Sequence, residues 1–139
     1  MKLSRTVAYA VQATLQLADA PPGAPVPCSQ LAATGHMPER FLLQILRHLV
    51  NHGILHSTRG VDGGYSLERP PQEISLLEVI EAIDGPLVAT IPTTDDGHFG
   101  RYEDRLRAAL EGVAETKRQQ LQAIKISDLL GPARVAKMA

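Results

Sequence analysis

The sequence predicts a mainly α-helical fold with a small two-stranded β-wing and a long C-terminal helix. An amphipathic segment over residues 38–52 runs directly into a glycine-rich hairpin at 54–68. A last amphipathic segment at 102–124 is too long to be covered by a chain of 139 residues. This combination is typical of a winged helix-turn-helix whose final helix pairs with a second subunit.

The first helix is expected over residues 2–18. Its apolar side chains recur at helical spacing, at Leu3, Val7, Val11, Leu15 and Ala18. Lys2, Ser4 and Arg5 stand at its start, where we predict contacts to a phosphate backbone. The alternative is that these three side chains are simply solvated.

A proline-rich stretch, 21–27, cannot be helical and predicts a rigid loop. A short helix is expected at 29–33, and residues 34–36 are expected to turn into the next helix.

The helix that follows should present one polar face. Pro38 suits the first helical position and is also a candidate DNA contact, and Gly53 should end the helix. The apolar face contains Leu42, Ile45, Leu46 and Leu49. The opposite face holds Arg40, Gln44, Arg47 and Asn51, so it offers two guanidiniums and amide groups suited to reading base edges.

A hairpin is expected next, with strands at 54–58 and 65–68 and a glycine-rich tip at 59–64. Ser57, Arg59 and Gly60 are its candidate contact residues, because an arginine carried on small residues can enter a narrow minor groove. The alternative is an ordinary hairpin with an incidental arginine. Helix and hairpin together predict a winged helix-turn-helix domain at 1–86.

The rest of the chain should support dimerisation. Ser75 and Glu78 form a capping box that opens a helix ending near Gly85. A loop is expected at 87–101, followed by a dimerisation helix and tail at 102–139. The stripe predicted to meet a second subunit contains Tyr102, Leu106, Leu110, Val113, Leu121 and Ile124. The alternative is that this helix folds back on its own domain.

Composition and motifs exclude several classes. Net charge is −1, and residues 1–70 carry six Lys/Arg against four Asp/Glu. This charge distribution is compatible with nucleic-acid binding but does not by itself indicate it. No apolar run has the length of a membrane span, and a cytoplasmic location is expected. No enzyme motif is present, so an enzyme is not expected. His48 and His52 have the spacing of a shared metal site, but such pairs also arise by chance, and no metal is predicted.

The chain also resembles a known family. The resemblance rests on Gly53-Ile54-Leu55, Ser57, Arg59-Gly60, Gly63-Gly64-Tyr65, Leu67, Arg69-Pro70, Ile74, Leu76, Val79-Ile80 and Asp84-Gly85-Pro86, with Met1–Ser4, Tyr9-Ala10 and Ile126–Leu130 outside that block. These motifs resemble the Rrf-type winged helix-turn-helix transcription regulators, the IscR/NsrR/CymR family. Many members hold an iron–sulfur cluster through three cysteines in the loop equivalent to 86–102. That loop has no cysteine here, so we expect no cofactor.

We therefore predict a sequence-specific DNA-binding transcription regulator: a homodimeric repressor that binds a dyad-symmetric double-stranded site and lacks the usual cluster ligands. The alternative is a winged-helix module that binds another protein without reading DNA sequence. Cys28, the single cysteine, is a candidate redox residue, since a thiol at a helix N-terminus can have a depressed pKa. Its other interpretation is a small apolar side chain that fills the core. The effector is left open.

Overall fold

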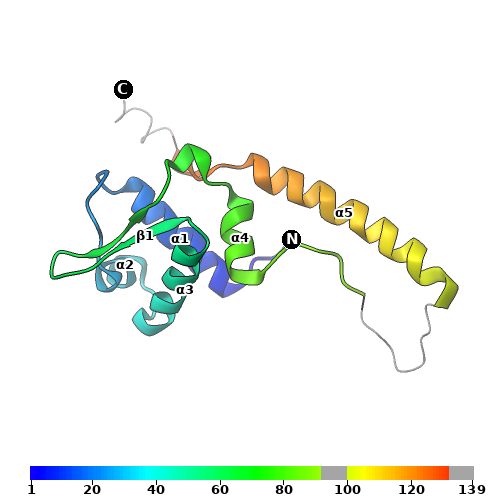
Figure 1. The fold of residues 1–139 in the computed structure, drawn as a ribbon, viewed down its shortest axis with the longest axis horizontal. Coiled ribbons are helices and arrows are strands. Elements are labelled where there is room, and N and C mark those ends of the chain that lie inside the picture. The colour runs from blue at the N-terminus through cyan, green and yellow to red at the C-terminus, as the bar shows by residue number, and fades with distance from the viewer. Residues whose placement is uncertain (92–99, 132–139) are drawn as a thin grey trace.

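The computed structural model describes residues 1–91 and 100–131. Within these residues, five α-helices and one antiparallel hairpin follow each other in the order α1 (Arg5–Asp19), α2 (Cys28–Gly35), α3 (Glu39–Asn51), β1 (Leu55–Thr58), β2 (Gly64–Leu67), α4 (Leu76–Asp84) and α5 (Glu103–Ala123). Short 3-10 turns occupy Pro71–Glu73 (η1), Gly100–Tyr102 (η2) and Ile126–Leu129 (η3). The predicted fold, mainly α with a two-stranded wing and a long C-terminal helix, is confirmed (Figure 1).

The core lies where α1 crosses α3 and α4. Small residues of α1, Ala10 and Ala13, are fully buried and allow the neighbouring helices to approach closely. The predicted apolar face of α3 is confirmed, because all four of its members are buried at 1% exposure or less: Leu42, Ile45, Leu46 and Leu49. Burial of side chains of this size contributes about 1.5–3 kcal/mol each. The core therefore fixes which face of α3 remains in solvent.

The starts of α1 and α3 differ from the predictions. The Ser4 hydroxyl accepts a hydrogen bond from the Val7 N–H at 3.2 Å, so α1 begins at Arg5, and Leu3 lies before it at 42% exposure. Pro38 is extended at ψ 123° and occupies the N-cap position of α3 instead of the first helical one. The ring then fixes the direction of entry into the helix without a hydrogen bond being lost. The turn before it depends on His36, which is left-handed at φ 54°.

The wing is tied to the segment ahead of α2. Strand β1 pairs with β2 in the register Leu55 with Leu67 through Thr58 with Gly64. On the other side of β2, Val26 and Tyr65 exchange two backbone hydrogen bonds of 2.9 Å each. The proline-rich loop therefore adds a one-residue third strand to the wing, which the sequence did not indicate.

Arg69 joins the exit of the wing to two other elements. Its guanidinium donates to the Gly53 carbonyl at 3.3 Å, to the Glu73 carbonyl at 2.8 Å and to the Glu78 carboxylate at 2.9 Å. The predicted capping box is confirmed, with the Ser75 N–H donating to Glu78 at 2.8 Å and the Glu78 N–H to the Ser75 hydroxyl at 3.1 Å. One arginine thus holds the end of α3 and the start of α4 in a fixed relation.

Helix α5 has one end packed against the domain and one end that projects from it (Figure 1). Near its C-terminus the Leu76 N–H donates to the Ile124 carbonyl at 2.8 Å, and the Ile126 N–H donates to the Ile74 carbonyl at 2.9 Å. Leu121 is buried among Val7, Leu77 and Ile80 of the same chain. No helix among residues 1–91 and 100–131 has both the length and the apolar character that crossing a membrane requires.

The apolar stripe predicted along α5 is therefore divided. Leu121, which we expected to face a second subunit, is 6% exposed and belongs to the chain's own core, so that expectation is corrected. Ile124 caps the helix and is partly buried. Toward the projecting end, Tyr102 is 58%, Leu110 37% and Val113 65% exposed, while Leu106 is partly buried.

Candidate nucleic-acid interface

The polar face of α3 is exposed, as the sequence pattern predicted. Burial of the apolar face turns Arg40, Gln44 and Arg47 toward solvent. None of the three makes an ion pair or hydrogen bond with another of the described residues. Their donors and acceptors are therefore not committed within this part of the chain, which is the condition for contacting base edges and phosphates.

The wing adds a third exposed arginine, Arg59, to the two on α3. Ser57, Arg59 and Gly60 are exposed, and the Val61 side chain at the tip is fully exposed to solvent. Gly63 allows the tip to close, because a Cβ there would lie 2.2 Å from the Thr58 carbonyl oxygen. The hairpin extends away from the domain on the side opposite the projecting end of α5 (Figure 1).

Helices α2 and α3 and the wing meet at one cluster. The Cys28 thiol lies 3.7 Å from the Glu39 carbonyl oxygen, and Tyr65 packs beside them. Burial raises the pKa of Tyr65, the neighbouring Cys28 adds to the rise, and the Arg47 guanidinium opposes it. Arg47 on α3 is therefore close enough for its charge to act on Tyr65 of the wing.

The predicted phosphate contacts at the start of α1 have different roles in the structure. Lys2 and Arg5 are exposed cations. Ser4 is the N-cap of α1, and its hydroxyl already accepts the Val7 N–H. The serine therefore has a structural role, while the two cations remain candidate contacts. Pro38, also named as a contact, is exposed at the N-cap of α3.

Cys28 does not have the activated character that its position suggested. It is the first residue of α2, but burial and the negative charge of Glu39 raise the pKa of its thiol above the ordinary value. The direction of the shift is therefore opposite to the depressed pKa that the redox interpretation required. Its side chain packs partly against the core, as the apolar interpretation expected.

The structure offers no histidine-based metal site within the ranges that it describes. The His52 ring Nδ1 lies 2.8 Å from the His48 carbonyl oxygen, so one of the paired histidines is engaged with the backbone. No group of three or more His, Cys, Asp or Glu side chains in residues 1–91 and 100–131 could hold a metal ion.

Two residues that organise this surface were not predicted as functional. Arg69 holds the end of α3 against α4, and Val26 holds the wing against the loop before α2. A signal for Arg69 was present in the sequence, because a lone cation followed by two prolines directly after a strand has a restricted backbone. No comparable signal marks Val26.

Taken together, a recognition-type helix with a free polar face and a cationic hairpin beside it define a winged helix-turn-helix protein of the DNA-binding class. The whole chain supports that class: it matches the Rrf2 family, described as iron-dependent transcriptional regulator, over residues 3–132. The chain belongs to the Rrf2 family of transcription regulators, whose members are not enzymes.

Individual relatives agree with this assignment. A protein of Mycobacterium tuberculosis assigned as an HTH-type transcriptional regulator is 36% identical over 143 residues, covering 100% of this chain and 89% of the relative. The transcriptional regulator CymR of Bacillus subtilis is 28% identical, covering 84% of this chain and 85% of CymR.

Solved structures give the same fold. The IscR structure from T. potens superimposes with a TM-score of 0.73 at 27% identity, covering 100% of this chain and 93% of that one. The structure of CymR, the global cysteine regulator of B. subtilis, superimposes with a TM-score of 0.72 at 25% identity, covering 94% of this chain and 96% of that one.

The iron named in the family description does not fit the thiols of this chain. Protein-bound iron–sulfur clusters are held mainly by cysteine thiolates, and this sequence has one cysteine. That cysteine lies at the start of α2, where its raised pKa disfavours the thiolate form that a metal requires.

Proposed function

We propose that this chain is a homodimeric repressor that acts in the cytoplasm, reads a dyad-symmetric operator and works without an iron–sulfur cluster. The observation that carries the proposal is the uncommitted polar face of α3, with Arg40, Gln44 and Arg47 exposed and unpaired among the described residues. It lies beside a wing that holds Arg59 in solvent. Repression follows where such a protein covers a promoter.

In this proposal α3 enters the major groove. Gln44 sits at the centre of the exposed face, where its amide can both donate to and accept from an adenine edge. Arg40 and Arg47 flank it by about one helical turn on either side, and each guanidinium suits guanine or a phosphate. The charges of Lys2 and Arg5 then neutralise neighbouring phosphates and contribute affinity without sequence preference.

The wing reads the adjacent minor groove. Ser57 and Gly60 provide small contacts to the backbone, and Arg59 provides the positive charge that a narrow minor groove attracts. Because Tyr65 joins the wing to Val26, the hairpin has a fixed base from which Arg59 extends.

The contact between the two subunits is made by α5. Tyr102, Leu110 and Val113 expose apolar surface on the projecting end of this helix, and a second copy of the same helix would cover it. A two-fold axis through that contact would place two α3 helices in major grooves about one turn, or a small multiple of it, apart. The operator is therefore expected to have dyad symmetry.

Duplex selection tests the DNA-reading part directly. A randomised duplex library gives the preferred site, and fluorescence anisotropy then measures its affinity for wild type and variants. We expect Gln44→Ala to cost roughly 1–3 kcal/mol on the preferred site and to relax selection at one position. Arg59→Ala should weaken binding, and Arg107→Ala, a change at a partly exposed arginine of α5 away from α3 and the wing, is the matched control that should leave affinity unchanged.

Added salt separates the proposal from the protein-interaction alternative. Phosphate binding should lose affinity steeply between 50 and 200 mM salt, with a slope reduced by about one unit when Arg47 becomes alanine. An affinity for duplex that is weak, insensitive to sequence and unchanged in Gln44→Ala would reject DNA reading and favour the protein-interaction module. Transcription in vitro from a promoter that contains the selected site then tests repression, since activation would give the opposite response.

A further inference from the structure

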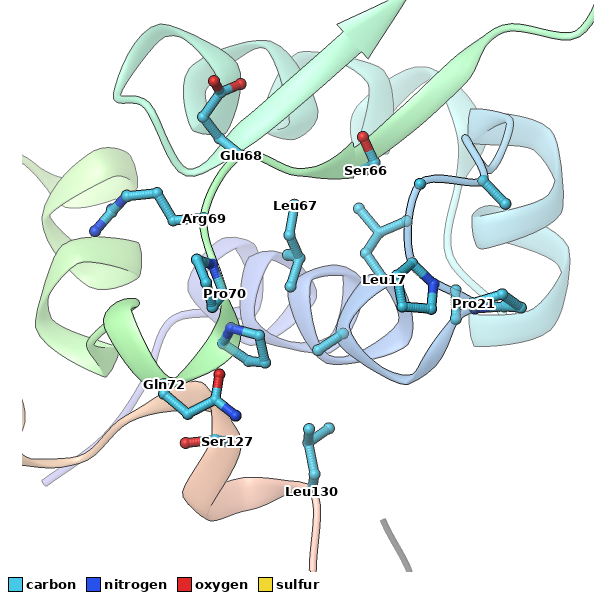
Figure 2. Close-up of a pocket in the computed structure, with 16 residues that line it drawn as sticks. Leu17, Pro21, Ser66, Leu67, Glu68, Arg69, Pro70, Gln72, Ser127 and Leu130 are labelled. Carbon is cyan, nitrogen blue, oxygen red and sulfur yellow. The ribbon is translucent and has the colours of Figure 1, made fainter. Parts of the chain in front are cut away.

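A cavity of about 490 Å³ lies on the face of the wing away from α3. Figure 2 shows that its walls come from three regions: the end of α1 with the loop after it, strand β2 with the wing exit, and η3. Leu17, Leu67 and Leu130 point into it from these three regions. This volume is in the range of small-molecule sites.

The interior of the cavity is uncharged. Its two ionisable lining residues are committed elsewhere: Glu68 lies 3.1 Å from the His56 ring, and Arg69 donates to Gly53, Glu73 and Glu78. Both side chains point away from the cavity in Figure 2. The remaining walls are mostly leucine, alanine and proline side chains, and the other residues in them are uncharged: Gly23, Ser66, Gln72 and Ser127. A charged ligand would lose its hydration here without gaining a partner.

The polar side chains among these walls are the Gln72 amide and the Ser66 and Ser127 hydroxyls. The Gln72 amide extends toward Ser127 and the cavity (Figure 2), and it has no hydrogen-bond partner among the described residues. Pockets for small molecules combine mostly apolar walls with a small number of such polar groups. The amide both donates and accepts, so it suits a carbonyl, a hydroxyl or an N–H group.

The cavity lies next to the contact that attaches the wing to the loop before α2. Ser66 and Leu67 of β2 form one wall, and β2 is the strand that pairs with Val26. The opposite wall is the segment from Ala20 to Ala24, which leads to Val26. A ligand between these walls would therefore contact both sides of the attachment that fixes the wing.

We propose that this cavity is an effector site for a neutral, mostly apolar small molecule with one hydrogen-bonding group, and that occupancy alters DNA affinity through the base of the wing. The coupling rests on the proposed function, whereas binding of the small molecule does not. By thermodynamic linkage, a ligand that changes DNA affinity must have its own affinity changed by DNA to the same factor.

The neutral fluorophore N-phenyl-1-naphthylamine, which is apolar and carries one N–H, tests the site on the full chain. Its fluorescence should rise saturably, with one probe bound per chain. Its anionic relative 8-anilinonaphthalene-1-sulfonate should bind at least about tenfold more weakly, because the sulfonate would be desolvated without a partner. Equal binding of the two probes, or no saturable binding of the neutral one, overturns the proposal.

Two variants and one control locate the probe. Ala20 is extended and lines the cavity, so Ala20→Phe should fill it and weaken binding at least about tenfold. Gln72→Leu keeps the size but removes the amide, and should weaken binding about fivefold. Ala123→Phe, an exposed change on α5 outside the cavity, should bind the probe like wild type. Wild-type affinity in folded Ala20→Phe and in Gln72→Leu overturns the assignment.

Anisotropy with the selected duplex then tests the coupling. We expect saturating probe to change the operator dissociation constant at least threefold in wild type and in Ala123→Phe, and not in Ala20→Phe. Probe binding with an unchanged DNA affinity overturns the effector role. Loss of all sequence-specific DNA binding without probe instead rejects the proposed function, while the probe titration still decides whether the site exists.

Discussion

Val26 and Tyr65 exchange two backbone hydrogen bonds of 2.9 Å across the inner edge of the wing. The contact passes close to Gly64, where a Cβ would lie 2.5 Å from the Val26 carbonyl group. The wing is therefore held to the segment before α2 at one point where only glycine fits. Its orientation toward α3 depends on that attachment.

Gly64→Ala should destabilise the fold. The added methyl group would collide with the Val26 backbone, and φ at this position is +152°, which side-chain-bearing residues rarely adopt. We expect a loss of about 1–3 kcal/mol in the free energy of unfolding, measured by chemical denaturation. Gly112→Ala is the matched control: it lies within α5 with no atom near its Cβ, and should stabilise by up to ~1 kcal/mol. Similar effects of both changes would contradict a specific contact at Gly64.

Val113→Asp should weaken self-association. Val113 is 65% exposed in the single chain, so a carboxylate there costs little until a second subunit covers it. Burying an unpaired charge is then expensive, and the dimer dissociation constant should rise by at least about tenfold in sedimentation equilibrium. Gln122→Asp, on the exposed side of the attached end of α5, should leave it unchanged. A wild type that is monomeric at micromolar concentration would reject the dimer altogether.

Cys28 should react slowly with iodoacetamide at neutral pH. Burial and Glu39 raise the pKa of its thiol, so the thiolate fraction is smaller than in free cysteine. Pseudo-first-order alkylation followed by mass spectrometry should therefore be slower than for glutathione under the same conditions. Cys28→Ser should retain DNA affinity and its response to peroxide. Faster alkylation than glutathione, or a peroxide response lost in the serine variant, would restore a redox role.

Glu78→Gln should remove a pH-dependent part of the stability. Burial raises the pKa of Glu78, but hydrogen bonds from the Ser75 N–H and Arg69 outweigh it, and the net pKa is lowered from 4.5. A lowered folded-state pKa means that the carboxylate stabilises the fold above about pH 4.5, and that this contribution is lost as pH falls through the folded value.

The variant should thus melt below wild type at pH 7, and the difference in Tm should shrink toward pH 3. Glu111→Gln, an exposed change on α5, should show a small and pH-independent difference. A Tm difference for Glu78→Gln that stays constant across this range would refute the linkage.

The features that depend on residues close together in the sequence were predicted correctly. The buried and exposed faces of α3, the Ser75–Glu78 capping box and the stop at Gly53 all depend on residues within a turn or two of each other, and all agree with the structure. The hairpin strands were predicted within one residue of their ends. The exposed candidate contacts on α3 and the wing follow from the same reasoning.

Contacts between distant segments were not predictable in this way. Leu121 has the spacing of an interface residue, and only the placement of α5 against α4 shows that Val7 and Ile80 cover it. Val26 stands in a run of prolines, and nothing near it indicates that it pairs with Tyr65. For Cys28 the helix N-terminus was visible in sequence, but the burial and the nearby Glu39 that raise the pKa of its thiol were not. Tertiary packing decided each of these cases.

The division of α5 has a consequence for how such regulators diversify. Its attached end, with Leu121 and the Ile124 carbonyl, belongs to the DNA-reading domain, whereas its apolar surface around Val113 stands clear of that domain. In the dimer proposed here, substitutions at the projecting end would therefore change which subunits recognise each other without disturbing α3. After a gene duplication, two copies could stop forming mixed pairs while both still recognise the ancestral operator, and operator preference could then drift separately.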